Sequence, residues 1–179
     1  MFKDFKDRDF KNICVIRSSS MLFPHVVDEL KDVFPQARIF AIITEGVDVI
    51  NQVDNIFALK GSGGFKWGKI KSVKNFFSDK NIDLAVVMYN TEKGIRYLNI
   101  DAFAFASGAR TVVSVNIKKK TAEITKRDFQ KKYVQRLINI LWVCLNFCVS
   151  FIVVCAVVVV MAVTAPFIFC LKKLVKHFE

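Results

Sequence analysis

"IDLAVVMYN", residues 82–90, decides the fold of this chain. From Leu84 to Met88 the stretch is continuously apolar. Short continuous apolar runs are typical of parallel strands that helices cover on both faces. We therefore expect residues 82–90 to form the central strand of a sheet.

The segments on either side of this strand alternate between strand and helix patterns. Apolar residues at helical spacing predict helices, and Gly108 follows the last of them in the usual C-terminal position. The expected strands are residues 12–17, 38–44, 55–60, 82–90 and 111–116, and the expected helices are residues 24–34, 46–53, 69–79 and 95–107. This alternation implies an α/β domain with a Rossmann-like parallel sheet of about five strands and helices on both faces.

A long apolar tail follows the α/β pattern. Residues 137–171, "LINILWVCLNFCVSFIVVCAVVVVMAVTAPFIFCL", contain no charged side chain. About 20 apolar residues span a bilayer core as a helix. The tail therefore predicts one C-terminal transmembrane helix, with Trp142 in the interface and Pro166 kinking or ending the far side.

Basic residues give the expected orientation of this helix. More of them precede the span than follow it, and the positive-inside rule places the larger group in the cytoplasm. The group before the span comprises Lys118, Lys119, Lys120, Lys126, Arg127, Lys131, Lys132 and Arg136, and the group after it comprises Lys172, Lys173 and Lys176. We expect a single-pass protein of the inner (cytoplasmic) membrane with its α/β domain in the cytoplasm. Because both flanks are basic, a re-entrant helix with both ends cytoplasmic is the alternative.

The net charge of +11 has two interpretations. A basic cluster is compatible with nucleic-acid binding. Next to a membrane span, however, the same cluster attracts anionic lipid. We favour membrane lipid as the partner of the group before the span, and we expect no nucleic-acid partner.

The chain divides into four expected parts. They are the α/β domain (residues 1–116), a basic juxtamembrane linker (117–136), the transmembrane helix (137–171) and a short basic tail (172–179). The first ten residues place Phe2, Phe5 and Phe10 among charges. They form either a short amphipathic segment against the membrane or the domain, or a frayed terminus.

Ligands of Rossmann-like folds bind beyond the carboxyl ends of the strands. The weak candidate ligand-binding residues there are Arg17, Ser18, Ser19, Ser20, Asn90 and Thr91. The "RSSS" stretch offers a cation, hydroxyls and backbone donors for a phosphate, but we favour the interpretation as an ordinary polar turn. No GxGxxG sequence follows the first strand and no P-loop occurs, so we expect no cofactor. The sequence shows no metal-ligand pattern and no catalytic constellation, and the cysteines are interpreted as packing residues.

Polar residues of the tail share one helical face. At 100° per residue they form a stripe with two valines, and polar side chains within a bilayer seek partners on other helices. This stripe consists of Asn139, Asn146, Ser150, Val153, Val157 and Thr164. It predicts an interface with an integral membrane protein.

The order of several motifs between residues 11 and 116 resembles the N-terminal lobe of glycosyltransferase family 9, the ADP-heptose:lipopolysaccharide heptosyltransferase family. The motifs are Arg17 after the first strand, Phe34–Pro35 with Ala37, Val53–Asp54, Ile82–Asp83–Leu84 and Ser107–Gly108–Ala109–Arg110. The resemblance implies a cell-envelope role and an acceptor-binding lobe.

The chain departs from this family in two respects. The family carries a Gly-Asp pair in its first loop, whose Asp is the candidate base, whereas residues 17–24 here contain no Asp. The family's second, donor-binding lobe is also missing. We therefore expect a membrane-anchored, non-catalytic accessory or scaffold subunit, a pseudoenzyme. The alternative is the acceptor-binding half of a split envelope glycosyltransferase whose donor lobe is a separate chain.

Overall fold

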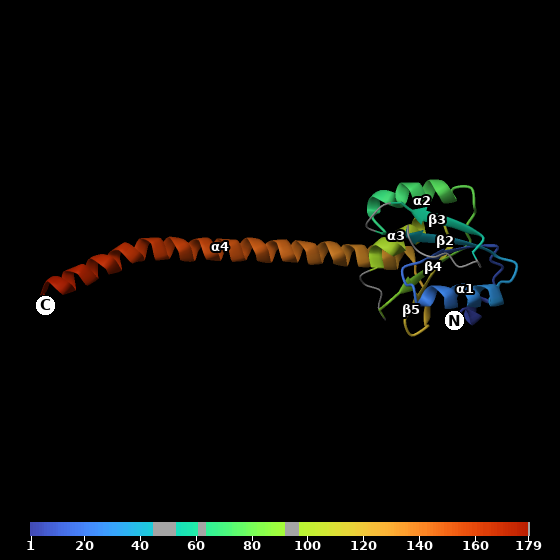
Figure 1. Ribbon diagram of the computed structural model, residues 1–179, viewed down its shortest axis with the longest axis horizontal. Helices are drawn as coiled ribbons and strands as arrows, with labels where there is room; N and C mark the ends of the chain where they lie inside the picture. Colours follow the sequence, from blue (N-terminus) through green and yellow to red (C-terminus); the bar gives the residue numbers. More distant parts are fainter. Residues whose placement is uncertain (45–52, 61–63, 92–96, 179) are drawn as a thin grey trace. The chain divides into compact units, whose positions relative to one another are not determined.

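The computed structural model of the chain describes residues 1–44, 53–60, 64–91 and 97–178 (Figure 1). The helix expected over residues 46–53 falls almost entirely outside this described part. The chain divides into two compact units, Met1–Tyr133 and Val134–Glu179. Each is described by itself below.

The first unit is built on a six-stranded sheet with the order β3-β2-β1-β4-β5-β6. The strands are β1 (Asn12–Ile16), β2 (Arg38–Thr44), β3 (Asn55–Leu59), β4 (Leu84–Tyr89), β5 (Thr111–Asn116) and β6 (Thr121–Glu123). The first five pair with one another in parallel, which confirms the Rossmann-like sheet. The order reverses between β1 and β4, as in nucleotide-binding folds of this type.

The expected number of about five strands is wrong, because β6 adds an antiparallel edge strand next to β5. This strand has three residues and lies in the basic stretch interpreted as a linker. A segment this short has too little alternation to predict a strand. The linker expected over residues 117–136 thus contains β6 and the first turns of the last helix.

The strand at residues 82–90 is central, as expected. All six residues of β4 are buried, and the strand pairs with β1 on one side and β5 on the other. Helix α1 (Leu22–Val33) packs on one face of the sheet, and helices α2 (Ile70–Phe77) and α3 (Leu98–Ala106) pack on the other (Figure 1). The helices on both faces explain why the strands are continuously apolar.

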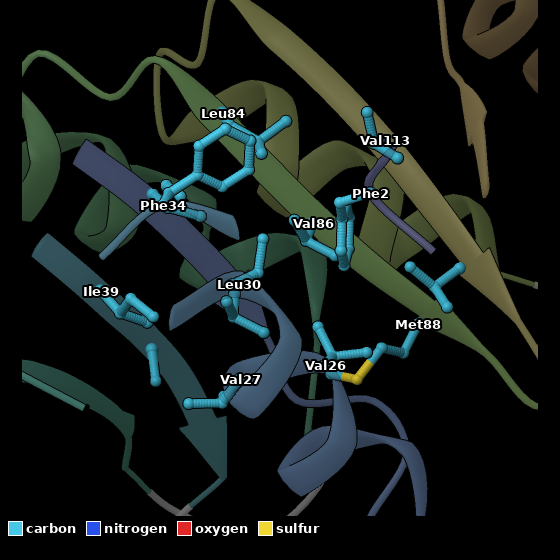
Figure 2. Close-up of a cluster of buried hydrophobic side chains, with 14 of the residues drawn as sticks. Phe2, Val26, Val27, Leu30, Phe34, Ile39, Leu84, Val86, Met88 and Val113 are labelled. Carbon is cyan, nitrogen blue, oxygen red and sulfur yellow. The ribbon is translucent and has the colours of Figure 1, made fainter. Parts of the chain in front are cut away.

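The N-terminal segment completes the core on the face of α1. Phe2 is fully buried, and Phe5 and Phe10 are each 8% exposed. Figure 2 shows Phe2 among Val86 and Val113 of the sheet. The frayed terminus considered from the sequence is wrong, because these phenylalanines pack against the domain. In the sequence, only the spacing of these phenylalanines among the charged residues indicated that they are buried.

The last helix, α4 (Lys126–Phe178), has 53 residues. Its start is fixed by a capping box, in which the Thr125 hydroxyl accepts from the Asp128 amide at 3.2 Å and the Asp128 carboxylate accepts from the Thr125 amide at 3.1 Å. The Thr125 hydroxyl also donates to the Asp128 carboxylate at 2.6 Å, and this bond, together with the one from the Thr125 amide, lowers the pKa of Asp128. The helix continues through Pro166. The expectation that Pro166 ends the helix is therefore wrong.

Within the described residues, α4 is the one helix that is long and apolar enough to cross a membrane, judged by length and composition. None of its apolar stretch is buried within the protein. A re-entrant segment requires a reversal of the chain, and α4 contains none between Lys126 and Phe178.

We predict that Phe2→Ala lowers the free energy of unfolding of the domain by about 3–5 kcal/mol, because the change empties a fully buried aromatic site. Urea unfolding of the full chain in mild detergent, followed by near-ultraviolet circular dichroism, measures the effect. Met21→Ala is the control, since Met21 is 83% exposed, and it is expected to change the stability by less than about 0.5 kcal/mol. Equal small effects of the two changes would contradict the packing of the N-terminal segment.

Candidate functional site

The candidate site lies at the carboxyl edge of the sheet, where the strand order reverses between β1 and β4. Residues 17–20 follow β1, and Asn90 and Thr91 follow β4. The fold therefore brings together the two groups of candidate ligand-binding residues. A hydrogen bond also ties the first group to β4, because the Ser18 hydroxyl donates to the carbonyl oxygen of Met88 near the end of this strand.

Two of the three serines have structural partners. Ser18 is held by the bond to Met88. Ser19 is only 4% exposed, and its hydroxyl accepts from the Leu22 amide at 3.4 Å, at the start of α1. These bonds favour the polar-turn interpretation of "RSSS" over the phosphate-binding one for Ser18 and Ser19.

The remaining candidates lie closer to solvent. Ser20, Asn90 and Thr91 are exposed. Arg17 is half-buried, and its guanidinium carbon lies 5.4 Å from the centroid of the Phe23 ring. A ligand at this edge would meet these four side chains rather than Ser18 and Ser19, whose hydroxyls are engaged with the backbone.

Tyr97 contacts the end of β4. Its phenolic oxygen accepts from the Asn90 amide at 3.1 Å, and its ring centroid lies 5.0 Å from that of Tyr89. Asn90, the residue after β4, is thereby bonded to the residue that precedes α3.

A polar cluster at the end of β4 consists of Tyr89, Asp101 and Lys132 and is here called the Asp101 cluster. Asp101 is fully buried on α3. Its Oδ1 accepts from the Tyr89 hydroxyl, and its Oδ2 accepts from Lys132 Nζ at 2.8 Å. Lys132 Nζ also donates to the Tyr89 hydroxyl oxygen at 3.1 Å. Three elements, β4, α3 and α4, thus contribute one side chain each.

Burial dominates the electrostatics of the Asp101 cluster. Desolvation raises the pKa of Asp101, and the hydrogen bonds from Lys132 and Tyr89 oppose that rise. Desolvation and the neighbouring carboxylate also raise the pKa of Tyr89. Because both Asp101 oxygens already accept hydrogen bonds within the protein, this carboxylate is placed to hold α4 rather than to remove a proton from a substrate.

Sequence analysis missed the Asp101 cluster, although one signal was present. Residues 98–106, "LNIDAFAFA", are apolar on all sides except for Asp101 and Asn99, and a helix that is apolar all round is buried. A buried carboxylate requires a partner. Nothing in the sequence distinguishes Lys132 from the other lysines before the span.

The basic residues expected at the membrane surface fall into three groups in the structure. Lys132 is only 21% exposed and pairs with Asp101, so it does not face lipid headgroups in this arrangement. Lys118, Lys119 and Lys120 lie in the turn between β5 and β6. Exposed positions on α4 hold the rest, which are Lys126, Arg127, Lys131 and Arg136.

The expected interface stripe lies entirely on α4. The Thr164 hydroxyl donates to the Val160 carbonyl at 2.9 Å within the same helix, so it needs no partner on another helix. Asn139, Asn146 and Ser150 are exposed. Val153 and Val157 continue the stripe and are each about half exposed.

A groove of about 630 Å³ separates α2 from α3. Its lining is mostly apolar, including Ile70, Phe77, Phe105 and Phe129, with Trp67 at one end. None of the candidate ligand-binding residues lines this groove, so it is distinct from the candidate site. Among the described residues, no group of three His, Cys, Asp or Glu side chains is placed to hold a metal ion.

These features define the class of the protein, an α/β domain with a Rossmann-like sheet whose last helix is long and apolar enough to cross a membrane. Comparison adds no family, since no protein-family model, curated protein or solved structure matches the chain.

Two residues of the glycosyltransferase-like motifs have structural roles at the opposite, amino edge of the sheet. Asp54 accepts from the Ile39 amide at 2.7 Å, and Asp83 accepts from the Lys11 and Asn12 amides at 3.0 and 3.1 Å. Any parallel sheet must satisfy such amides at the starts of its strands. These motif positions therefore carry information about the fold more than about glycosyl transfer.

We predict that Lys132→Met lowers the free energy of unfolding by about 3 kcal/mol, because it leaves Asp101 buried without its cation. Replacing all three polar groups (Tyr89→Phe, Asp101→Val and Lys132→Met) restores most of this loss, since well-packed apolar groups are a neutral exchange for a buried ion pair. Urea unfolding of the full chain in detergent measures both.

Lys131→Met is the control for this pair of variants, because Lys131 is exposed and adjacent. It is expected to change the stability by less than about 0.5 kcal/mol. The account fails if Lys132→Met costs no more than Lys131→Met.

Proposed function

We propose that this chain is a membrane-anchored, non-catalytic accessory or scaffold subunit that binds an integral membrane protein. One observation carries the proposal: a single continuous helix, α4, starts as a capped and packed part of the α/β domain and includes an uncharged run longer than one bilayer crossing requires. A helix with both properties ties a folded domain to a membrane without a loose linker.

The arrangement of the candidate site supports a non-catalytic role. Ser18 and Ser19 bond to the backbone, and both oxygens of Asp101 bond to Tyr89 and Lys132. The side chains that would be nucleophile or base at this edge are thus engaged in holding the fold.

The split glycosyltransferase is the second candidate function. The exposed Ser20, Asn90 and Thr91 at the point where the strand order reverses would form one wall of a cleft that another chain completes. The motif order that resembles glycosyltransferase family 9 supports this candidate, and the first loop without an Asp opposes it.

The partner surface is proposed to be the stripe of Asn139, Asn146, Ser150, Val153 and Val157 on α4. Asn146 lies within the uncharged run, where an amide that faces lipid is costly and an interhelical hydrogen bond stabilises. Thr164 is left out because its hydroxyl bonds within its own helix. The basic group before the span favours the inner membrane with the domain in the cytoplasm.

We predict that Asn146→Leu with Ser150→Leu preserves membrane insertion but weakens co-purification of the partner, because the substitutions remove the polar groups that would bond across helices. Quantitative mass spectrometry of the full chain isolated from its native membrane in mild detergent measures the partner's yield.

The matched control is Cys144→Leu with Cys148→Leu, two substitutions with the same spacing on nearly the opposite face. Loss of the partner from the control variant alone would show that the wrong face was chosen. A partner that carries a nucleotide-sugar-binding lobe would overturn the scaffold proposal in favour of the split enzyme.

A further inference from the structure

The chain leaves its first compact unit at the carboxyl edge of the sheet. The first two turns of α4 run antiparallel to α3, since Phe129 packs on Phe105 (ring centroids 5.2 Å apart) and Lys132 reaches Asp101. Lys132 also contacts Tyr89, the last residue of β4. The end of this unit, Tyr133, therefore lies at the carboxyl edge.

The apolar run begins very near this edge. Leu137 is the fourth residue after Tyr133, and four residues span at most about 14 Å in any conformation. The chain itself thus holds the carboxyl edge close to the start of the proposed membrane span, whatever the orientation of the two units.

Two aromatic side chains gather at this exit point. Trp67 is 43% exposed and Tyr133 is 44% exposed, and their ring centroids lie 6.4 Å apart. Trp67 belongs to the short 3-10 helix η2 (Trp67–Lys69) that precedes α2. Half-exposed Trp and Tyr are favoured in the interface between membrane and water.

Exposed lysines occupy the same edge. Lys60 follows β3 and Lys66 precedes η2. Lys119 and Lys120 lie in the turn after β5, where the Asn116 side chain accepts from the Lys118 and Lys120 amides, each at 3.0 Å. This turn holds Lys119 at a φ of 58°, a left-handed conformation that Gly or Asn adopts more readily.

At the opposite edge, Asp54, Asp83 and Glu123 each form an ion pair with a basic side chain. Asp54 and Asp83 cap the starts of strands there, and Glu123 and Asp128 lie near the start of α4. Lys126 and Arg127 also belong to that end, because Ile124 bonds to Val112 at the start of β5. They precede Tyr133 by about 10 Å along the helix.

We infer that the carboxyl edge of the sheet, with Lys60, Lys66, Trp67, Lys119 and Lys120, is the surface that the domain lays against an anionic lipid bilayer. This inference rests on the proposed membrane anchorage. A ligand at the reversal point between β1 and β4 would accordingly be presented from the membrane surface, not from bulk solvent.

The sequence order and the fold make opposite predictions about which pair of basic residues holds the domain against an anionic bilayer. In the sequence, Lys126 and Arg127 are closer to the span than Lys119 and Lys120. In the fold, Lys119 and Lys120 share the edge from which the chain leaves, and Lys126 and Arg127 lie at the other end. Substitution of either pair removes two positive charges. A difference between the two variants therefore reports where the charges lie in the fold, not how many there are.

The experiment uses Trp67 as its own probe, in the full chain with Trp142→Phe, which removes the other tryptophan. The chain is reconstituted into vesicles of brominated phosphatidylcholine, alone or mixed with phosphatidylglycerol. We expect a blue shift and quenching of Trp67 emission that grow with phosphatidylglycerol. Lys119→Gln with Lys120→Gln removes most of the phosphatidylglycerol-dependent quenching, whereas Lys126→Gln with Arg127→Gln leaves it unchanged.

The inference is overturned if the second pair abolishes the quenching and the first pair does not, or if Trp67 is unquenched in both kinds of vesicle. The emission of Trp142, measured in the Trp67→Phe chain, reports insertion of the helix separately from docking of the edge. Quenching of Trp142 without quenching of Trp67 rejects the docked edge and keeps the anchor, and absence of both rejects the anchor as well.

Discussion

A carboxylate buried without water must be paired, and in this chain the pairing of Asp101 determines how the domain ends. An unpaired charge at a fully buried position would cost several kcal/mol. Tyr89 supplies one hydrogen bond from the end of the central strand, but the compensating cation comes from Lys132, beyond the sheet in sequence. The first two turns of α4 are therefore part of the α/β domain, although they belong to the same helix as the apolar run.

This constraint relates the parts of the first unit to one another. The antiparallel strand β6 returns the chain to the start of β5, and the Thr125–Asp128 capping box starts α4 there. The helix then runs along α3 until Lys132 meets Asp101. The carboxyl edge of the sheet consequently holds three features: the exit of α4 from the first unit, the reversal point of the strand order, and the lysine-rich turn after β5. The same edge is the one at which folds of this class bind ligands.

The sequence predicted those features that depend on periodicity. Buried parallel strands are continuously apolar, so β1 to β5 could be placed, and α1 to α3 followed from helical spacing. Contacts between distant segments were left open or missed. Packing of the N-terminal segment against the domain was one of the alternatives from the sequence, but the burial of Phe2 depends on the open face beside α1. Strand β6 was missed, because it depends on β5 as a template. The candidate ligand residues follow β1 and β4 as the sequence predicted, but the bonds of Ser18 and Ser19 to the backbone depend on the folded arrangement.

The central claim is that residues 126–133 are a docked helix of the domain rather than a loose linker. Limited trypsin digestion of the full chain in nanodiscs tests it directly, because Lys126, Arg127, Lys131 and Lys132 are all potential cleavage sites. The account predicts cleavage at these sites no faster than at Lys31 or Lys74 within α1 and α2. Release of an otherwise intact domain from its tail as the first product would contradict it.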